Sequence, residues 1–122
     1  MNTIGYFEIQ ANEPEKAVEF YAEVFGWNFV EQTGLPIRYW RIETDGIAGG
    51  LLERPASMPP TECGTNAYTC SIQVADFDST EETIFNNGGQ IAMPKFEIPG
   101  RCWQGYFIDP DNNVFGIFEV IE

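Results

Sequence analysis

The sequence predicts an α+β fold of two βαβββ modules, in which paired curved four-stranded sheets surround a cavity and the helices lie outside. The first observation is an internal repeat: segment 42–53 matches segment 108–119, and segment 9–26 matches segment 72–89, in the same order. A period of about 65 residues is too long for a solenoid and fits a duplicated half-domain. The second observation is that each copy carries a helix-period pattern and four strand-like runs, in the order β-α-β-β-β.

The first module, about residues 1–54, is predicted to hold four strands and one helix. Its strands are expected at 4–10, 27–32, 37–44 and 48–53, where β-branched and aromatic residues are frequent. The helix is expected to follow Asn12, which can cap it, and to begin near Pro14, which suits a first turn. Gly26 is expected to end it. Its buried face is predicted from apolar residues at helical spacing, and these are Ala17, Val18, Phe20, Tyr21, Val24 and Phe25.

The second module, about residues 68–122, follows a linker predicted at about 55–67, where proline is frequent. Its helix is expected to open at Asp76 or Asp78 and to end at 87–89. The buried stripe of that helix is predicted to be Phe77, Ile84 and Phe85. The strands are expected at 68–74, 90–94, 103–108 and 114–121, with a loop at 95–102 and a turn at 109–113.

Composition excludes several classes of function. A chain of 122 residues is one domain that buries about two-thirds of its unfolded surface. The net charge of −13, with six basic residues, argues against nucleic acid and anionic membranes as partners. The charge serves solubility or favours cationic or neutral ligands, and both interpretations stay open. No apolar run approaches the ~20 residues of a membrane span, and we expect no signal peptide.

The cysteines and the absence of histidine limit the chemistry further. Cys63, Cys70 and Cys102 are an odd number at no metal-binding spacing, which is typical of reduced thiols in a cytoplasmic protein. Cys102 lies beside Arg101, which could lower its thiol pKa. The sequence holds no histidine, so it has no histidine base, no Ser-His or Cys-His couple and no histidine-containing metal site.

Several motifs along the chain resemble one family. Phe-Tyr at 20–21 precedes Phe-Gly-Trp at 25–27, Asn-Gly-Gly follows at 87–89, and Asp-Pro-Asp-Asn-Asn-Val-Phe-Gly spans 109–116. Over nearly the whole chain they resemble the glyoxalase-like domain proteins of the vicinal oxygen chelate superfamily. Glyoxalase I, the bleomycin resistance proteins and the extradiol dioxygenases belong to that group. The resemblance implies paired βαβββ modules and commonly a homodimer, and it indicates fold more strongly than chemistry.

The resemblance also implies where a divalent ion would bind, through one side chain on the first and one on the last strand of each module. In this sequence those positions are Tyr6, Gly50, Thr69 and Gly116. Divalent ions need imidazole nitrogen or carboxylate oxygen, and none of the four residues supplies either. Glu8, two residues beyond Tyr6 on the same face, is a lone ligand remnant or a polar cavity wall. We therefore expect no metal and no cofactor.

The predicted cavity is lined by polar and aromatic side chains, a combination typical of ligand pockets. The candidate ligand-binding residues are Tyr6, Glu8, Gln10, Tyr39, Arg41, Leu52, Thr69, Ser71, Gln73, Tyr106 and Phe118, with Trp103 at the mouth. Alternatively, these side chains fill one another's space, with Glu8 and Arg41 as a buried ion pair.

Three functions are compatible with these residues. The first is a metal-free protein that binds a small molecule in the cavity between its modules, to sequester or to sense it. The second is a metal-independent enzyme of the lyase or isomerase type. It would use Glu8 as general base on a small carbonyl compound, with Tyr6, Tyr39 or Arg41 as the electrophilic partner. The third is a non-catalytic interaction module or subunit.

Overall fold

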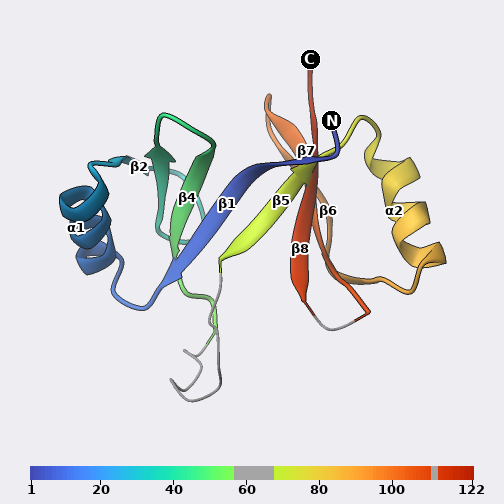
Figure 1. The fold of residues 1–122 in the computed structure, drawn as a ribbon, viewed down its shortest axis with the longest axis horizontal. Helices are drawn as coiled ribbons and strands as arrows, with labels where there is room; N and C mark the ends of the chain where they lie inside the picture. Colours follow the sequence, from blue (N-terminus) through green and yellow to red (C-terminus); the bar gives the residue numbers. More distant parts are fainter. Residues whose placement is uncertain (57–67, 111–112) are drawn as a thin grey trace. The chain divides into compact units, whose positions relative to one another are not determined.

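The chain forms two compact units in a computed structural model that describes residues 1–56, 68–110 and 113–122. Most of the predicted linker, with Cys63, and positions 111–112 of the last turn lie outside the described residues. The N-terminal unit is Tyr6–Tyr68, and the C-terminal unit is Met1–Gly5 with Thr69–Glu122. The order β-α-β-β-β occurs twice along the chain (Figure 1). This order confirms the predicted α+β class and the repeated module.

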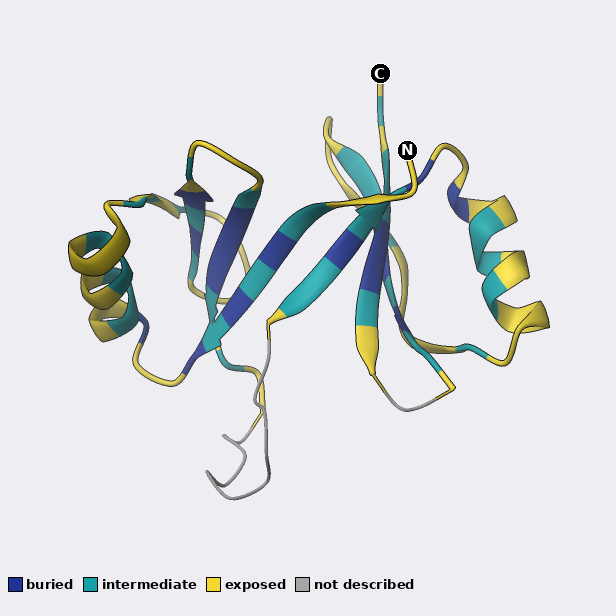
Figure 2. Ribbon diagram, viewed as in Figure 1, coloured by how far each residue is buried: buried dark blue, intermediate teal, exposed yellow. Residues whose placement is uncertain are grey.

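The N-terminal unit contains one helix and a mixed sheet. Its elements are β1 (Thr3–Ala11), whose first three residues belong to the C-terminal unit, α1 (Pro14–Phe25), β2 (Asn28–Gln32), β3 (Tyr39–Glu43) and β4 (Ala48–Glu53). The strands lie in the order β2-β3-β4-β1, with β1 parallel to β4 and the other pairs antiparallel. Buried and half-buried residues alternate along β1 (Figure 2), because successive side chains of a strand point to opposite faces. The buried side chains pack beneath α1, and they are Phe7, Ile9, Ala11, Trp40, Ile42 and Leu51.

The ends of α1 confirm one prediction and correct another. Gly26 ends the helix in the left-handed conformation, at φ 71°, and its N–H donates to the carbonyl of Ala22 at 2.9 Å. The N-cap residue is Glu13, and no side chain caps the helix there. The prediction that Asn12 caps α1 is therefore wrong. The rigid Pro14 begins the helix, and its missing N–H removes one of the groups that a cap would satisfy.

The buried face of α1 is narrower than its apolar pattern predicts. Ala17, Val18 and Tyr21 pack against the core of the unit. The indole of Trp27 stacks on the ring of Tyr21 with centroids 5.4 Å apart, so a residue after the helix fills part of the contact. The other predicted members are exposed over more than half of their surface, and these are Phe20, Val24 and Phe25 at 57%, 55% and 59%.

The C-terminal unit repeats the arrangement. Its elements are β5 (Thr69–Gln73), α2 (Phe77–Asn86), β6 (Gln90–Ile98), β7 (Cys102–Ile108) and β8 (Val114–Val120). The strands lie in the order β5-β8-β7-β6, with β5 parallel to β8 and the other pairs antiparallel. The start of the chain lies with this unit: the N–H of Asn2 donates to the carbonyl of Gln73 at 2.7 Å, and the ring of Phe118 covers Gly5.

The predictions for α2 hold in part. Asp76 caps the helix, as one of the two predicted candidates, and its carboxylate accepts from the N–H of Ser79 at 2.9 Å. Phe77 is fully buried and Ile84 packs against the same core. Phe85 is 45% exposed, so its place in the buried stripe is wrong. Neither described helix is long and apolar enough to cross a membrane.

Strand β6 is longer than predicted. The sequence predicts a strand at 90–94 and a loop at 95–102, but the strand continues to Ile98 and only residues 99–101 separate it from β7. The pairing with β7 shifts between Ile91 and Met93 and again between Met93 and Phe96. The second shift spans Pro94, which has no N–H to give to the ladder. The irregularity therefore accommodates a proline that normally ends a strand.

Candidate functional site

One face of the N-terminal sheet gathers half of the predicted binding residues. Alternation along β1 and β3 places them opposite the side chains that pack beneath α1. We call this surface the polar face, and its residues are Tyr6, Glu8, Gln10, Tyr39, Arg41, Gly50 and Leu52. Every side chain in this set is half-buried, and Gly50 is buried. The polar face is therefore partly solvated and carries both a carboxylate and a guanidinium.

Two phenols and a carboxylate form a connected chain on the polar face. The hydroxyl oxygens of Tyr6 and Tyr39 lie 2.5 Å apart, and the Tyr39 hydroxyl donates to Oε2 of Glu8 at 3.4 Å. Gly50 makes room for this arrangement, because a side chain there would overlap the Tyr39 hydroxyl. Glu8 pairs in register with Gly50. The phenol of Tyr39 therefore occupies the space beside Glu8 that a side chain at position 50 would fill.

The remaining residues of the polar face flank this chain. Gln10 and Leu52 pair in register between β1 and β4, and Nη2 of Arg54 donates to the Gln10 carbonyl at 3.0 Å. Arg41 pairs in register with Gly50 on the side away from β1. No described carboxylate forms an ion pair with Arg41. The alternative of a buried Glu8–Arg41 ion pair is therefore not realised within the described chain.

The C-terminal unit holds the equivalent positions with different chemistry. Ser71 pairs in register with Gly116, and a side chain at Gly116 would overlap the hydroxyl of Ser71 and the amide of Gln104. Nε2 of Gln104 donates to Oγ of Ser71 at 3.2 Å. These two side chains are 2% and 6% exposed, so they are a buried neutral pair. Sequence reasoning missed Gln104, although its period-two spacing with Tyr106 on β7 was the available signal.

Alternation along β7 also corrects the position of Trp103. Gln104 shares a face with Ser71, whereas Trp103 packs with the core beneath α2. The ammonium of Lys95 lies 4.8 Å from the centroid of the Trp103 ring. Trp103 therefore does not share a face with the other predicted binding residues of this unit. Those are Thr69, Ser71, Gln73, Tyr106 and Phe118.

The donor set does not fit the divalent ion that the fold family implies. The phenol of Tyr6 already contacts Tyr39, and the space at Gly50 is filled by the Tyr39 hydroxyl. The space at Gly116 is filled by a hydroxyl and an amide. No group of three or more His, Cys, Asp or Glu side chains that could hold a metal occurs within the described ranges. Phenol, amide and hydroxyl groups are poor substitutes for the imidazole and carboxylate ligands of such ions.

Cys102 is not an activated thiol. Burial raises its pKa, and the nearby charge of Arg101 only partly opposes this. A raised pKa leaves less thiolate at neutral pH, and the thiolate is the nucleophile. The sequence suggested that Arg101 could lower the pKa of the Cys102 thiol, but the effect of desolvation is larger.

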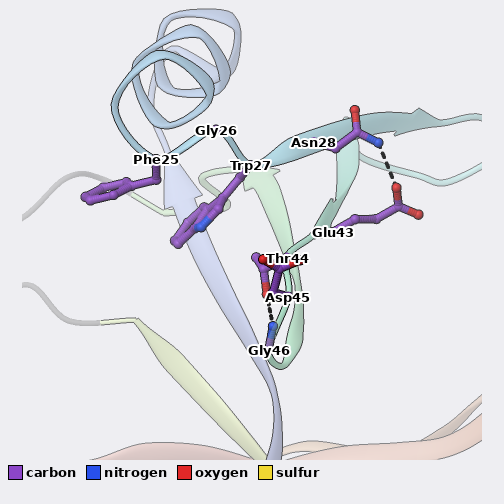
Figure 3. Close-up of a pocket in the computed structure, with 8 residues that line it drawn as sticks. All are labelled: Phe25, Gly26, Trp27, Asn28, Glu43, Thr44, Asp45 and Gly46. Carbon is purple, nitrogen blue, oxygen red and sulfur yellow. Dashed lines mark hydrogen bonds between the residues drawn. The ribbon is translucent and has the colours of Figure 1, made fainter.

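A hollow of about 570 Å³ lies between the end of α1 and the β3–β4 turn (Figure 3). Nδ2 of Asn28 donates to Oε1 of Glu43 at 2.7 Å across one side of it. The hydroxyl of Thr44 accepts from the N–H of Gly46 at 3.0 Å and donates to the carbonyl of Ile47 at 2.9 Å. These groups hold the turn together, and the hollow shares no residue with the polar face. The polar face is thus the stronger candidate site.

Comparison with known proteins identifies relatives along almost the whole chain. The model of the glyoxalase/bleomycin resistance protein/dioxygenase superfamily matches residues 3–117. The protein CFP32 of Mycobacterium bovis is 24% identical over 119 residues, which are 96% of this chain and 45% of that protein. A glyoxylase-like domain-containing protein of Didymella fabae is 29% identical over 93 residues, 71% of this chain and 69% of that protein. The chain thus spans less than half of the length of CFP32.

Solved structures share the fold at low sequence identity. A hypothetical protein from Bacillus halodurans superposes with a TM-score of 0.75 and 14% identity, covering 98% of this chain and 95% of that chain. Methylmalonyl-CoA epimerase from Mycobacterium tuberculosis gives a TM-score of 0.72 and 14% identity, covering 98% and 88%. At this identity the likeness extends to the fold alone.

Proposed function

Because the chain belongs to the glyoxalase/bleomycin resistance protein/dioxygenase superfamily, we propose that it binds a small molecule on its polar face without a divalent metal, to sequester or to sense it. The observation that carries the proposal is the Tyr6–Tyr39–Glu8 chain beside Gly50. Its phenols and carboxylate lie at and beside Tyr6 and Gly50, two of the positions for which the resemblance implies metal ligands. Placed polar groups among aromatic walls are what small-molecule sites typically offer.

Thermal shift against a panel of metabolites and antibiotics tests the binding. A ligand that binds only the folded chain raises Tm. Glu8→Gln and Tyr39→Phe should reduce that shift, whereas Glu97→Gln should not. Glu97 is an exposed carboxylate of β6 that loses the same charge. If no compound raises Tm, or if the Glu97 variant reduces the shift as much as the Glu8 variant, the proposal fails.

The metal-free part of the proposal has its own measurement. After dialysis, elemental analysis should find far less than one equivalent of nickel, zinc, iron or manganese. The physical reason is the donor set, in which Gly50 offers no side chain and Tyr6 is already held by Tyr39. About one equivalent of metal that disappears in Glu8→Ala would contradict it.

A metal-independent enzyme is the second candidate function, and the contact between Tyr39 and Glu8 favours it. A carboxylate held by a phenol can act as a general base, and the neighbouring phenol can donate to the oxygen of a carbonyl substrate. Turnover of a small carbonyl compound that Glu8→Gln abolishes and Glu97→Gln leaves intact would support this function. Binding that is retained without any turnover would leave only sequestration or sensing.

Cellular context and assembly complete the proposal. Cys70 and Cys102 are free thiols, which supports a reducing, cytoplasmic location. The net charge of −13 supports partners other than nucleic acid and anionic membranes. The exposed apolar residues of α1 support a homodimer. A non-catalytic subunit role is the outcome if ligand binding and turnover are both absent.

A further inference from the structure

Arg41 is a charged residue of the polar face with no carboxylate partner among the described residues. Arg38, three residues earlier, differs from Arg41 because it pairs with both Glu15 and Glu31. In a chain of net charge −13, acidic groups are plentiful, yet none of those described engages Arg41. A half-buried guanidinium left in this way is a ready donor for an anionic ligand, since its planar fork matches a carboxylate.

The register of the sheet relates Arg41 to Glu8. Both residues pair with Gly50, Glu8 from β1 and Arg41 from β3. Neighbouring strands lie about 4.8 Å apart, so the two backbones flank Gly50 at about 10 Å from each other. Because Gly50 has no side chain, the phenol of Tyr39 is the group that occupies the space above it. One small molecule can therefore contact the guanidinium and the Tyr39–Glu8 pair together.

Resting on the proposed function, we propose that the ligand of the polar face is a small carboxylic acid with a hydroxyl or amino group on the neighbouring carbon. Its carboxylate pairs with the guanidinium of Arg41. Its hydroxyl or amino group donates a hydrogen bond to the Glu8 carboxylate. The charge of Glu8 and the net charge of the chain disfavour a multiply charged anion such as phosphate.

Matched pairs of acids and amides test this ligand class. Lactate, serine and mandelate are titrated into the protein by calorimetry, beside lactamide, serinamide and mandelamide, which lack the carboxylate, and beside inorganic phosphate. At least one acid should bind while its amide does not. Arg41→Gln should weaken that acid about tenfold or more, the range expected for losing a charged hydrogen bond. The affinity of Arg41→Lys for the acid should lie between those of the parent chain and Arg41→Gln, because an ammonium keeps the positive charge but not the planar fork of a guanidinium.

Arg101→Gln is the control for loss of positive charge. Arg101 lies in the exposed turn before β7 of the C-terminal unit, and it also makes no ion pair with a described residue. Its variant should bind the acid as the parent chain does. Since Arg41 has no ion-pair partner to lose within the described part of the chain, Arg41→Gln should retain the parent melting temperature, and this retention would show that the variant folds.

Two results overturn the inference. In the first, amides or neutral compounds bind, Glu8→Gln weakens their binding, and Arg41→Gln does not. The polar face is then a binding site for compounds other than acids, and the proposed function stands without this inference. If none of the probes binds at millimolar concentration, the assignment of this ligand class is wrong.

Discussion

At the scale of single residues, the two adjacent glycines of β4, Gly49 and Gly50, have different structural roles. A side chain at Gly49 would meet the ring of Phe7 in the core, whereas a side chain at Gly50 would meet the end of the Tyr39 side chain on the polar face. The ring of Phe7 is 8% exposed and has nowhere to move. The ring of Tyr39, by contrast, is half-buried, and it would have to move together with its hydroxyl. Gly49 thus serves packing, and Gly50 serves the candidate site.

We predict that Gly49→Ala lowers the free energy of unfolding by about 1–3 kcal/mol, the usual cost of overpacking. Gly50→Ala should cost less than about 1 kcal/mol, yet it should break the contact between the hydroxyls of Tyr6 and Tyr39. Urea denaturation measures the first effect, and tyrosine signals in nuclear magnetic resonance report the second. Gly46→Ala has room for its methyl group and is the control. Equal stability losses at positions 49 and 50 would contradict this division.

Tyr68 gives a prediction for alkaline pH. Burial, and secondly the hydrogen bond to the Tyr21 hydroxyl at 2.6 Å, raise the pKa of Tyr68 to about 12 from 10.0. Because the pKa is higher in the folded chain, the contribution to stability is complete below pH 10 and is lost as the pH rises through about 12. The side chain is 47% exposed, which keeps this contribution small.

The difference in tyrosinate absorbance between the parent chain and Tyr68→Phe should show this late titration. In Tyr21→Phe the pKa of Tyr68 should fall part of the way back toward 10, since burial remains the larger cause. An unchanged titration in the Tyr21 variant would show that the hydrogen bond contributes nothing.

Predictions for single residues were confirmed where the conformation depends on neighbouring residues in the sequence. The left-handed Gly26 and the capping carboxylate of Asp76 depend on backbone groups one turn away, so the sequence is sufficient. The neutral pair of Ser71 and Gln104 depends on strand register between distant segments. Period-two spacing with Tyr106 was enough to put Gln104 on the face of Tyr106 and Trp103 on the other face, but the pairing of Gln104 with Ser71 depends on register, which is set by the assembled sheet.

At the scale of elements, Lys95 connects β6 to the beginning of α2. Its ammonium lies 2.9 Å from Oδ1 of Asp78 and 5.2 Å and 4.8 Å from the ring centroids of Phe77 and Trp103. The sequence places Lys95 in a loop, because Pro94 normally ends a strand. The observed strand continues through the irregular pairing, and the lysine side chain holds it against the helix.

We predict that Lys95→Ala lowers the free energy of unfolding by about 1–2 kcal/mol, because it removes cation–π contacts and an ion pair that are partly shielded from water. Lys16→Ala is the matched control. Lys16 pairs with Glu13 on the surface and its side chain is 77% exposed, so its loss should cost less than about 0.5 kcal/mol. Chemical denaturation of both variants measures these losses. Equal losses of unfolding free energy would show that the aromatic contacts of Lys95 do not contribute to stability.

At the scale of the whole molecule, one layout is used twice with different chemistry. Each unit pairs a residue of its first strand with a glycine of its last strand, Glu8 with Gly50 and Ser71 with Gly116. In each, a polar side chain of the neighbouring strand fills the glycine's vacant space. The internal repeat was visible in the sequence and was enough for the fold. The difference between an ionisable N-terminal set and a neutral, buried C-terminal pair required the structure.

The last prediction concerns assembly, and we expect the chain to form a homodimer through α1. Phe20, Val24 and Phe25 are each more than half exposed, and their spacing puts them on neighbouring positions of the helix surface. Large exposed apolar groups that gather in this way are typical of interfaces. The net charge of −13 per chain opposes association, so added salt should strengthen the dimer by screening that repulsion.

Light scattering at tens of micromolar protein should give twice the mass of one chain, and Phe20→Glu combined with Val24→Glu should give a monomer. Ile91→Glu combined with Met93→Glu adds the same charge at two exposed apolar positions of β6 and should leave the dimer intact. A monomeric parent chain would refute the dimer. A dimer that survives the α1 changes but is lost with the β6 changes would move the interface from the helix to the edge strand, whose irregular pairing would then be part of the contact.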